Sequence, residues 1–170
     1  MKQIVIGILA VLALYGCNGN AQQINNKKMS KLIYVMDPLC GWCYGNSANT
    51  QHLYDTYKNQ IDFEILPAGM WIGENARKQS KPMAQYIKKH DLQIQQVTGT
   101  AFGQDYFKFV ENESIVLDSE IPSRAIVTVK KIWATQAVSF AIEVQKARYL
   151  HAKDLNDDAT YLSICENLKL

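Results

Sequence analysis

Cys40 and Cys43, with two residues between them, belong to the stretch of residues 37–43 (DPLCGWC) that directly follows the apolar run of residues 32–36 (LIYVM), and a segment of helical character begins at Cys40. The apolar run predicts a buried strand. A helix that begins at the first cysteine would direct its unpaired N–H groups and the positive end of its dipole at that thiol, which favours the thiolate. The sequence therefore predicts a strand, a dithiol turn and a helix, in this order.

A second strand is predicted at residues 62–66 (DFEIL), where polar and apolar residues alternate before Pro67. One helix over residues 40–59 would connect the two strands, so we expect a βαβ unit with parallel strands. Beyond Pro67 the strand signals stop and helical periodicity takes over. The apolar pattern of residues 126–147 fits either one long helix or two helices joined near residues 134–136. Two strands alone do not make a stable sheet, so we expect an incomplete sheet.

The first 16 residues have the features of a bacterial secretion signal. Lys2 supplies a positive charge, and residues 4–14 (IVIGILAVLAL) are apolar but shorter than the ~20 residues of a membrane span. The following Leu14-Tyr15-Gly16-Cys17 resembles the lipobox of bacterial lipoproteins, which implies cleavage before Cys17 and lipidation of its thiol. An ordinary cleaved signal and an uncleaved anchor are the alternatives. We expect an extracytoplasmic protein, in the periplasm or outer cell envelope, with a lipid anchor in the membrane.

Charge and cysteine content exclude several classes of protein. The net charge is +2 and no basic tract is present, so we expect no nucleic-acid partner. Four cysteines, at positions 17, 40, 43 and 165, are too few for a disulfide framework. If Cys17 carries lipid, Cys40 and Cys43 pair with each other and Cys165 remains alone. We expect Cys165 to be a buried small hydrophobic residue.

The stretch Asp37-Pro38-Leu39-Cys40-Gly41-Trp42-Cys43-Tyr44-Gly45 resembles the DsbA-like thioredoxin-fold thiol–disulfide oxidoreductases, in particular their FrnE-type branch. Residues 120–125 (EIPSRA) and Gly69-Met70 fit the same branch. The resemblance covers about residues 31–165. It implies an α/β fold with a thioredoxin-like βαβ core and an inserted all-helical domain.

In this family the chain returns after the helical insertion with more strands and with a cis-proline loop that faces the dithiol. No proline follows Pro122, and the sequence ends at Leu170. Set against this family, we expect the C-terminal strands to be missing, as in a truncated product, and a degenerate stand-alone protein is the alternative. We expect a signal peptide at 1–16, a flexible tether at 17–30, the N-terminal part of the thioredoxin-like domain at 31–75 and the helical insertion at 76–170.

Cys40 is the candidate nucleophile, and Cys43 is the candidate resolving thiol. Gly41 and Trp42 carry no charge, so we expect the helix terminus to supply most of any lowering of the Cys40 pKa. Asp37 either assists proton transfer or caps the turn before Pro38. Trp42 either faces substrate or packs over the helix. An inert disulfide and half of a zinc site are the alternatives for the cysteine pair.

The remaining polar candidates receive structural interpretations. His90 and His151 lie on predicted apolar faces, so we expect both in the core and away from Cys40. A cysteine hydrolase needs a histidine near its thiol and is disfavoured for this reason. Arg124 and Glu120 are expected to form an ion pair at a helix start.

These observations favour a thiol–disulfide oxidoreductase of the cell envelope. It would form, reduce or isomerise disulfides in proteins through its Cys-Gly-Trp-Cys dithiol, and a redox partner would recycle that dithiol. We expect no cofactor and no metal. The alternative is a non-catalytic envelope lipoprotein whose Cys-x-x-Cys is structural or holds a metal. The sequence does not decide the direction of electron flow, because this depends on how strongly the reduced thiolate is stabilised.

Overall fold

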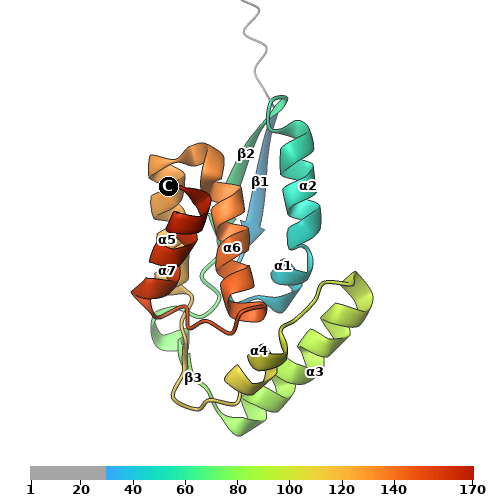
Figure 1. The fold of residues 1–170 in the computed structure, drawn as a ribbon, viewed down its shortest axis with the longest axis vertical. Helices are drawn as coiled ribbons and strands as arrows, with labels where there is room; N and C mark the ends of the chain where they lie inside the picture. Colours follow the sequence, from blue (N-terminus) through green and yellow to red (C-terminus); the bar gives the residue numbers. More distant parts are fainter. Residues whose placement is uncertain (1–29) are drawn as a thin grey trace, which may run out of the picture.

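The computed structural model describes residues 30–170, which fold around a small parallel sheet (Figure 1). Strands β1 (Ser30–Met36) and β2 (Ile61–Pro67) pair in parallel, with Leu32 opposite Phe63. This confirms the predicted βαβ unit. The predicted signal peptide, the lipobox with Cys17 and all of the tether except Ser30 lie outside the described residues.

The segment between the two strands forms two helices, where one was predicted. Helix α1 (Gly41–Gly45) ends at Asn46, and helix α2 (Ser47–Tyr57) begins directly after it. Asn46, with φ −92° and ψ −1°, forms a turn between the two helices, and the glycine before it is a poor helix former. The short α1 therefore carries the dithiol on its own, one helical turn ahead of α2.

Helices make up most of the chain after β2, as predicted. The periodic segment after residue 120 divides at a 3₁₀ turn, so the alternative with two helices is the correct one. Helix α3 begins at a Ser80 side chain that accepts a hydrogen bond from the Met83 N–H, with proline in its first turn. The elements are η1 (Gly73–Asn75), α3 (Lys81–Thr98), α4 (Gln104–Phe109), α5 (Glu120–Ile132), η2 (Ala134–Gln136), α6 (Ala137–Tyr149) and α7 (Asp158–Leu168).

Two very short strands within this helical region were not predicted. Strand β3 (Arg77–Lys78) pairs antiparallel with β4 (Val116–Leu117). The expectation that no strand follows Pro67 is therefore wrong at these positions. Strands of two residues are too short to show an alternating pattern, so the sequence carried no signal for them.

The helices cover one face of the β1–β2 sheet. Helices α5 and α6 contact β2, and α6 also contacts α1 and α2, while α3 and α4 lie together beyond α1 (Figure 1). Met36 and Ile65 point from the strands into a core that Ile126, Phe140 and Val144 complete. Helix α1, which follows the C-terminal end of β1, contacts both α6 and α3, and this is where the dithiol lies.

The opposite face of the sheet is open to solvent over part of its area. Ile33 and Val35 of β1 are 51% and 57% exposed, and Leu66 of β2 is also exposed. The prediction of a buried strand at residues 32–36 is therefore wrong for this face, because no described element packs on it. None of the described helices combines the length and the hydropathy that a membrane span requires.

Candidate active site

Cys40 occupies the N-cap position of α1, four residues after Met36, the last residue of β1. Its backbone is extended, with φ −92° and ψ 112°, and its carbonyl accepts a hydrogen bond from the Tyr44 N–H at 3.1 Å. A Cβ atom added at Gly41 would lie 2.5 Å from Oδ1 of Asp91 and 2.9 Å from Cδ1 of Ile94. Glycine at this position therefore lets α1 and α3 approach closely. The predicted helix start at the first cysteine is confirmed.

The two thiols of the motif have opposite ionisation. Cys40 and Cys43 are half-buried free thiols. A hydrogen bond from the Cys43 thiol lowers the pKa of Cys40 to about 6, the backbone N–H groups of Cys43 and Trp42 add to this, and burial and the Asp37 charge oppose it. The same thiol–thiol hydrogen bond, together with burial, raises the pKa of Cys43. At neutral pH Cys40 is therefore a thiolate and Cys43 a thiol.

The cause of the lowered pKa differs from the sequence-based expectation. The helix terminus was expected to supply most of it, whereas the hydrogen bond from the Cys43 thiol is the largest single cause, ahead of each backbone N–H group. The reason is geometric: α1 is only five residues long, so its dipole is small, and the second thiol of the motif lies within hydrogen-bonding reach of the first.

Asp37 is a buried carboxylate that connects three segments of the chain. It is only 3% exposed. Its Oδ1 accepts hydrogen bonds from the Leu39 N–H at 2.8 Å and from the Ser119 hydroxyl at 3.0 Å, and its Oδ2 accepts one from the Met70 N–H at 2.5 Å. These contacts match the turn-capping alternative and extend it to the loop after β2 and the start of α5. A role in proton transfer stays a prediction.

Ser119 belongs to the site, and the sequence reading missed it. It is fully buried, donates to Asp37, and accepts the Trp71 N–H at 3.2 Å through Oγ. Its own N–H donates to the Trp71 carbonyl at 2.7 Å. Ser119 lies 82 residues from Asp37 in the sequence, so no local pattern links them. The available signal was a serine directly before a predicted helix, which reads as an ordinary N-cap.

A cavity of about 270 Å³ opens beside Cys40. Trp42 lines it and is 48% exposed, a position from which its ring can contact a bound substrate. The other walls come from segments far apart in the sequence: the loop after β2, helix α3 and the end of α6. Residues from these segments include Met70, Trp71, His90, Asp91, Arg148 and Tyr149.

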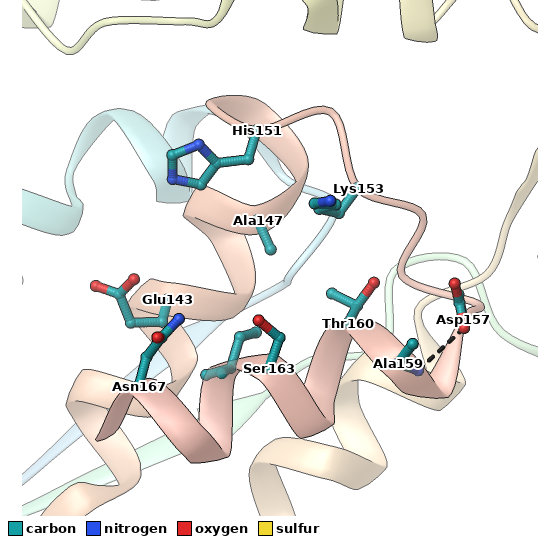
Figure 2. Close-up of a pocket in the computed structure, with 10 residues that line it drawn as sticks. Glu143, Ala147, His151, Lys153, Asp157, Ala159, Thr160, Ser163 and Asn167 are labelled. Atoms are coloured by element: carbon teal, nitrogen blue, oxygen red, sulfur yellow. Dashed lines mark hydrogen bonds between the residues drawn. The ribbon is translucent and has the colours of Figure 1, made fainter. Parts of the chain in front are cut away.

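The expectation that His90 and His151 are core residues is wrong. His90 is half-buried, lines the Cys40 cavity and packs on the Tyr86 ring, with centroids 4.2 Å apart. The face of α3 that carries it borders this cavity, so the apolar periodicity was misread. His151 is exposed and lines a different pocket between the end of α6 and α7, which no cysteine borders (Figure 2).

Two other candidates lie away from the dithiol. Arg124 and Glu120 form the predicted ion pair, with Nε 3.1 Å from Oε1. Cys165 is half-buried in α7, where it packs against the edge of the main core rather than inside it. Within residues 30–170, no group of three or more His, Cys, Asp or Glu side chains gathers in an arrangement that could hold a metal ion.

Asp91 is a second buried carboxyl group at this site. Its Oδ2 accepts a hydrogen bond from the Tyr106 hydroxyl at 2.6 Å. Burial raises the pKa of Asp91 to about 6, while the Tyr106 hydrogen bond and the nearby charges of Arg148 and His90 oppose the shift. Asp91 therefore changes its charge close to physiological pH.

We expect Asp91 to make folding less favourable as the pH rises. Below about pH 4 the carboxyl is protonated in both states; between about pH 4 and 6 only the folded state holds the proton, so stability falls through this window by up to about 3 kcal/mol. Urea unfolding of the full chain and of Asp91→Asn, from pH 4 to 7.5, measures this. As the pH rises from 4 to 6, the unmodified chain should lose unfolding free energy relative to the Asp91→Asn variant. If the difference in unfolding free energy between the two proteins does not change with pH, the raised pKa of Asp91 is contradicted.

Comparisons with known proteins agree with this architecture. No protein-family model and no curated protein matches the sequence. Among solved structures, the cytosolic disulfide reductase DsbM from Pseudomonas aeruginosa matches with a TM-score of 0.69 and 29% identity over 82% of this chain and 64% of DsbM. A structure of DsbM with GSH matches at 27% identity. A candidate protein disulfide isomerase from Nitrosomonas europaea has a TM-score of 0.72 over 84% of this chain and 66% of its own, and its 22% identity supports the fold alone.

A strand, a dithiol at the N-terminus of a short helix, and a second parallel strand packed against a helical block define a thioredoxin-fold protein with a Cys-x-x-Cys site. The neighbours narrow this class further. Its solved neighbours include the disulfide reductase DsbM at 29% identity, and this likeness supports the DsbA-like class. The chain spans less than two thirds of the length of DsbM. Its assignment to the FrnE-type branch stays a prediction.

Proposed function

We propose that this protein is a thiol–disulfide oxidoreductase that works through Cys40 and Cys43. The observation that carries the proposal is the divided ionisation of the pair: the pKa of Cys40 is lowered to about 6 and that of Cys43 is raised. Such a pair presents one reactive thiolate, while the second thiol stays protonated until it resolves the mixed disulfide. The similarity to a disulfide reductase supports the proposal.

The dithiol would reduce a substrate disulfide in two steps. The Cys40 thiolate attacks one sulfur, the substrate S–S bond breaks, and the leaving sulfur departs as a thiolate that takes a proton from water. Cys43 then loses its proton and attacks Sγ of Cys40, which releases the second substrate thiolate and leaves a Cys40–Cys43 disulfide. Two electrons pass from the dithiol to the substrate, and the reverse sequence would oxidise a substrate dithiol.

The first step would itself activate the second thiol. The pKa of Cys43 is raised mainly by its hydrogen bond to Cys40, with burial second and the charges of Cys40 and Asp37 contributing less. Once Cys40 is in a mixed disulfide, its negative charge has gone and can no longer hold the Cys43 proton. The resolving thiol is therefore released for attack only after the substrate is bound covalently.

The biological setting proposed here rests on the sequence of residues 1–17. We place the protein in the cell envelope, anchored by lipid on Cys17, with protein thiols and disulfides as substrates and a separate redox partner that recycles the dithiol. DsbM, in contrast, is described as cytosolic. The structure of DsbM with GSH supports glutathione as a further candidate partner.

The pH dependence of Cys40 alkylation tests the divided ionisation. In the full chain with Cys17 and Cys165 replaced by alanine, we expect the rate of reaction with iodoacetamide to rise with a midpoint near pH 6. Cys43→Ala removes the thiol hydrogen bond, so the midpoint should move up towards about 8.5, the ordinary value for a thiol. A midpoint near 8.5 with Cys43 present would remove the main support for the proposal.

Equilibration with glutathione buffers gives the direction of electron flow. Alkylation gel shifts report the oxidised fraction of the same protein. A two-electron transition at roughly −120 to −180 mV would indicate an oxidase or isomerase, and one near about −270 mV a reductase. A pair that never titrates, or that binds zinc, would favour the non-catalytic alternative.

A further inference from the structure

Arg148 of α6 carries a buried positive charge that forms no ion pair, although the charge of Asp91 lies near enough to interact with it. The residue is 3% exposed, and its Nε has no hydrogen-bond partner. None of the ion pairs within residues 30–170 includes it. A buried guanidinium is costly unless acceptors satisfy its N–H groups. The unfilled donor capacity of Arg148 therefore points to an anionic ligand.

Aromatic rings hold the guanidinium in place. Its central carbon lies 5.5 Å from the ring centroid of Phe109, 5.7 Å from that of Tyr149 and 5.8 Å from that of Tyr106. Such contacts stabilise the cation through the ring faces, but they provide no acceptor in the plane of the guanidinium. The planar N–H groups that recognise a carboxylate remain available.

Arg148 and Cys40 line the same cavity of about 270 Å³. A ligand whose sulfur reacts with Cys40 therefore enters a space that also contains the unpaired guanidinium. Between them the walls are largely apolar and aromatic, with Leu39, Trp71 and Ile87 among the lining residues. These walls suit an uncharged stem between a sulfur atom and a charged end.

Besides Cys40 and Arg148, the titratable side chains that line this cavity are Asp91, His90 and the tyrosines Tyr86, Tyr106 and Tyr149. Asp91 is engaged with the Tyr106 hydroxyl and forms no ion pair with Arg148. Its negative charge would oppose a second carboxylate in the cavity. Neutralising Asp91 and neutralising Arg148 should therefore change the binding of an anionic ligand in opposite directions.

We propose that this cavity binds a small thiol or disulfide that carries a carboxylate, with the carboxylate on Arg148 and the sulfur at Cys40. The inference rests on the proposed function and names a substrate class for it. A residue that is 3% exposed at the wall of a small cavity is accessible to a slender molecule rather than to a broad protein surface. Arg148 would thus be a specificity-determining residue.

Three disulfides that differ in charge test the proposal on the full chain with Cys17 and Cys165 replaced by alanine. They are glutathione disulfide, the disulfide of glutathione diethyl ester, in which every carboxylate is esterified, and neutral hydroxyethyl disulfide. Stopped-flow measurement of the reaction with the reduced protein gives a second-order rate constant for each. We expect glutathione disulfide to react roughly tenfold or more faster than its ester, after each is normalised to its rate with free dithiothreitol.

Matched variants test whether Arg148 causes the preference for the disulfide that carries carboxylates. Arg148→Gln should lower the ratio of the glutathione disulfide rate to the hydroxyethyl disulfide rate by roughly tenfold or more, and Arg148→Lys should restore part of it. Asp91→Asn should raise the same ratio. Arg124→Gln removes the same charge from an exposed ion pair of α5 and should leave the ratio within about twofold. Circular dichroism establishes that each variant is folded.

The possible outcomes are distinct. Equal normalised rates for glutathione disulfide and its ester would overturn the proposal without any variant, and so would an unchanged ratio in folded Arg148→Gln. A loss in Arg148→Gln that is the same for charged and neutral disulfides would mean that Arg148 is structural, which also overturns it. Failure of the proposed function looks different: the unmodified dithiol would then not react with hydroxyethyl disulfide either.

Discussion

Cys40→Ala is expected to lower the rate of disulfide exchange by roughly a thousandfold or more, because it removes the only thiol of the pair that is ionised at neutral pH. Cys43→Ala should behave differently. It retains the attacking thiol and lacks the resolving one, so a substrate should remain attached to Cys40 as a mixed disulfide. Mass spectrometry after incubation with glutathione disulfide would show this adduct on the Cys43→Ala chain and not on the Cys40→Ala chain.

Cys165→Ala is the matched control for both variants, since Cys165 is a free thiol that packs at the edge of the core. It should leave exchange unchanged. Stable adducts on the Cys40→Ala chain through Cys43 would show that the roles of the two thiols are reversed. Loss of folding in Cys40→Ala, followed by circular dichroism, would instead support a structural cysteine pair.

Asp37→Ala is expected to destabilise the fold by about 3 kcal/mol or more. The substitution leaves the Leu39 and Met70 N–H groups and the Ser119 hydroxyl without their acceptor, and the bonds from Leu39 and Ser119 are buried, so water replaces the acceptor poorly there. Urea denaturation of the full chain measures the loss. The same variant should also lower the alkylation midpoint of Cys40, because the Asp37 charge raises the pKa of that thiol.

Two substitutions directly before α5 provide a scale for the loss of stability in Asp37→Ala. Asp118→Ala removes a half-buried carboxylate that accepts one exposed hydrogen bond, from the Glu120 N–H at 2.8 Å, and should cost about 1 kcal/mol. Ser119→Ala removes one of the three donors to Asp37 and should be intermediate. If Asp37→Ala costs no more than Asp118→Ala, the buried carboxylate does not hold the three segments together.

The sequence predicted those features of the fold and of the site that depend on residues close together in the chain. The strand before Cys40, the helix start at that residue, the parallel second strand and the helical segment after residue 120 follow from local patterns, and each is present. Whether that segment forms one helix or two was left open by its periodicity, and the structure has two. The Arg124–Glu120 ion pair is local in the same sense, since one turn of helix separates the two residues. The Cys-x-x-Cys motif itself is local, and it carries the largest cause of the lowered Cys40 pKa.

The surroundings of the dithiol could not be read from the sequence, because they come from segments brought together by folding. Ser119, His90 and Arg148 approach the site from the start of α5, from α3 and from the end of α6. On its own helix each residue has an ordinary interpretation, as a cap, a core residue or a member of an apolar face. Only the packing of these helices around α1 makes them parts of one site.

The open face of the sheet has a practical consequence for all of these measurements. Ile33, Val35 and Leu66 expose apolar surface beside a strand, β1, which within residues 30–170 pairs on one side only. Exposed apolar strands with an unpaired edge are starting points for association between copies of a chain. Self-association would add its own free energy to every unfolding curve and slow every encounter with a disulfide. Variants should therefore be compared at one protein concentration, with a dilution series by light scattering as the first preparation check.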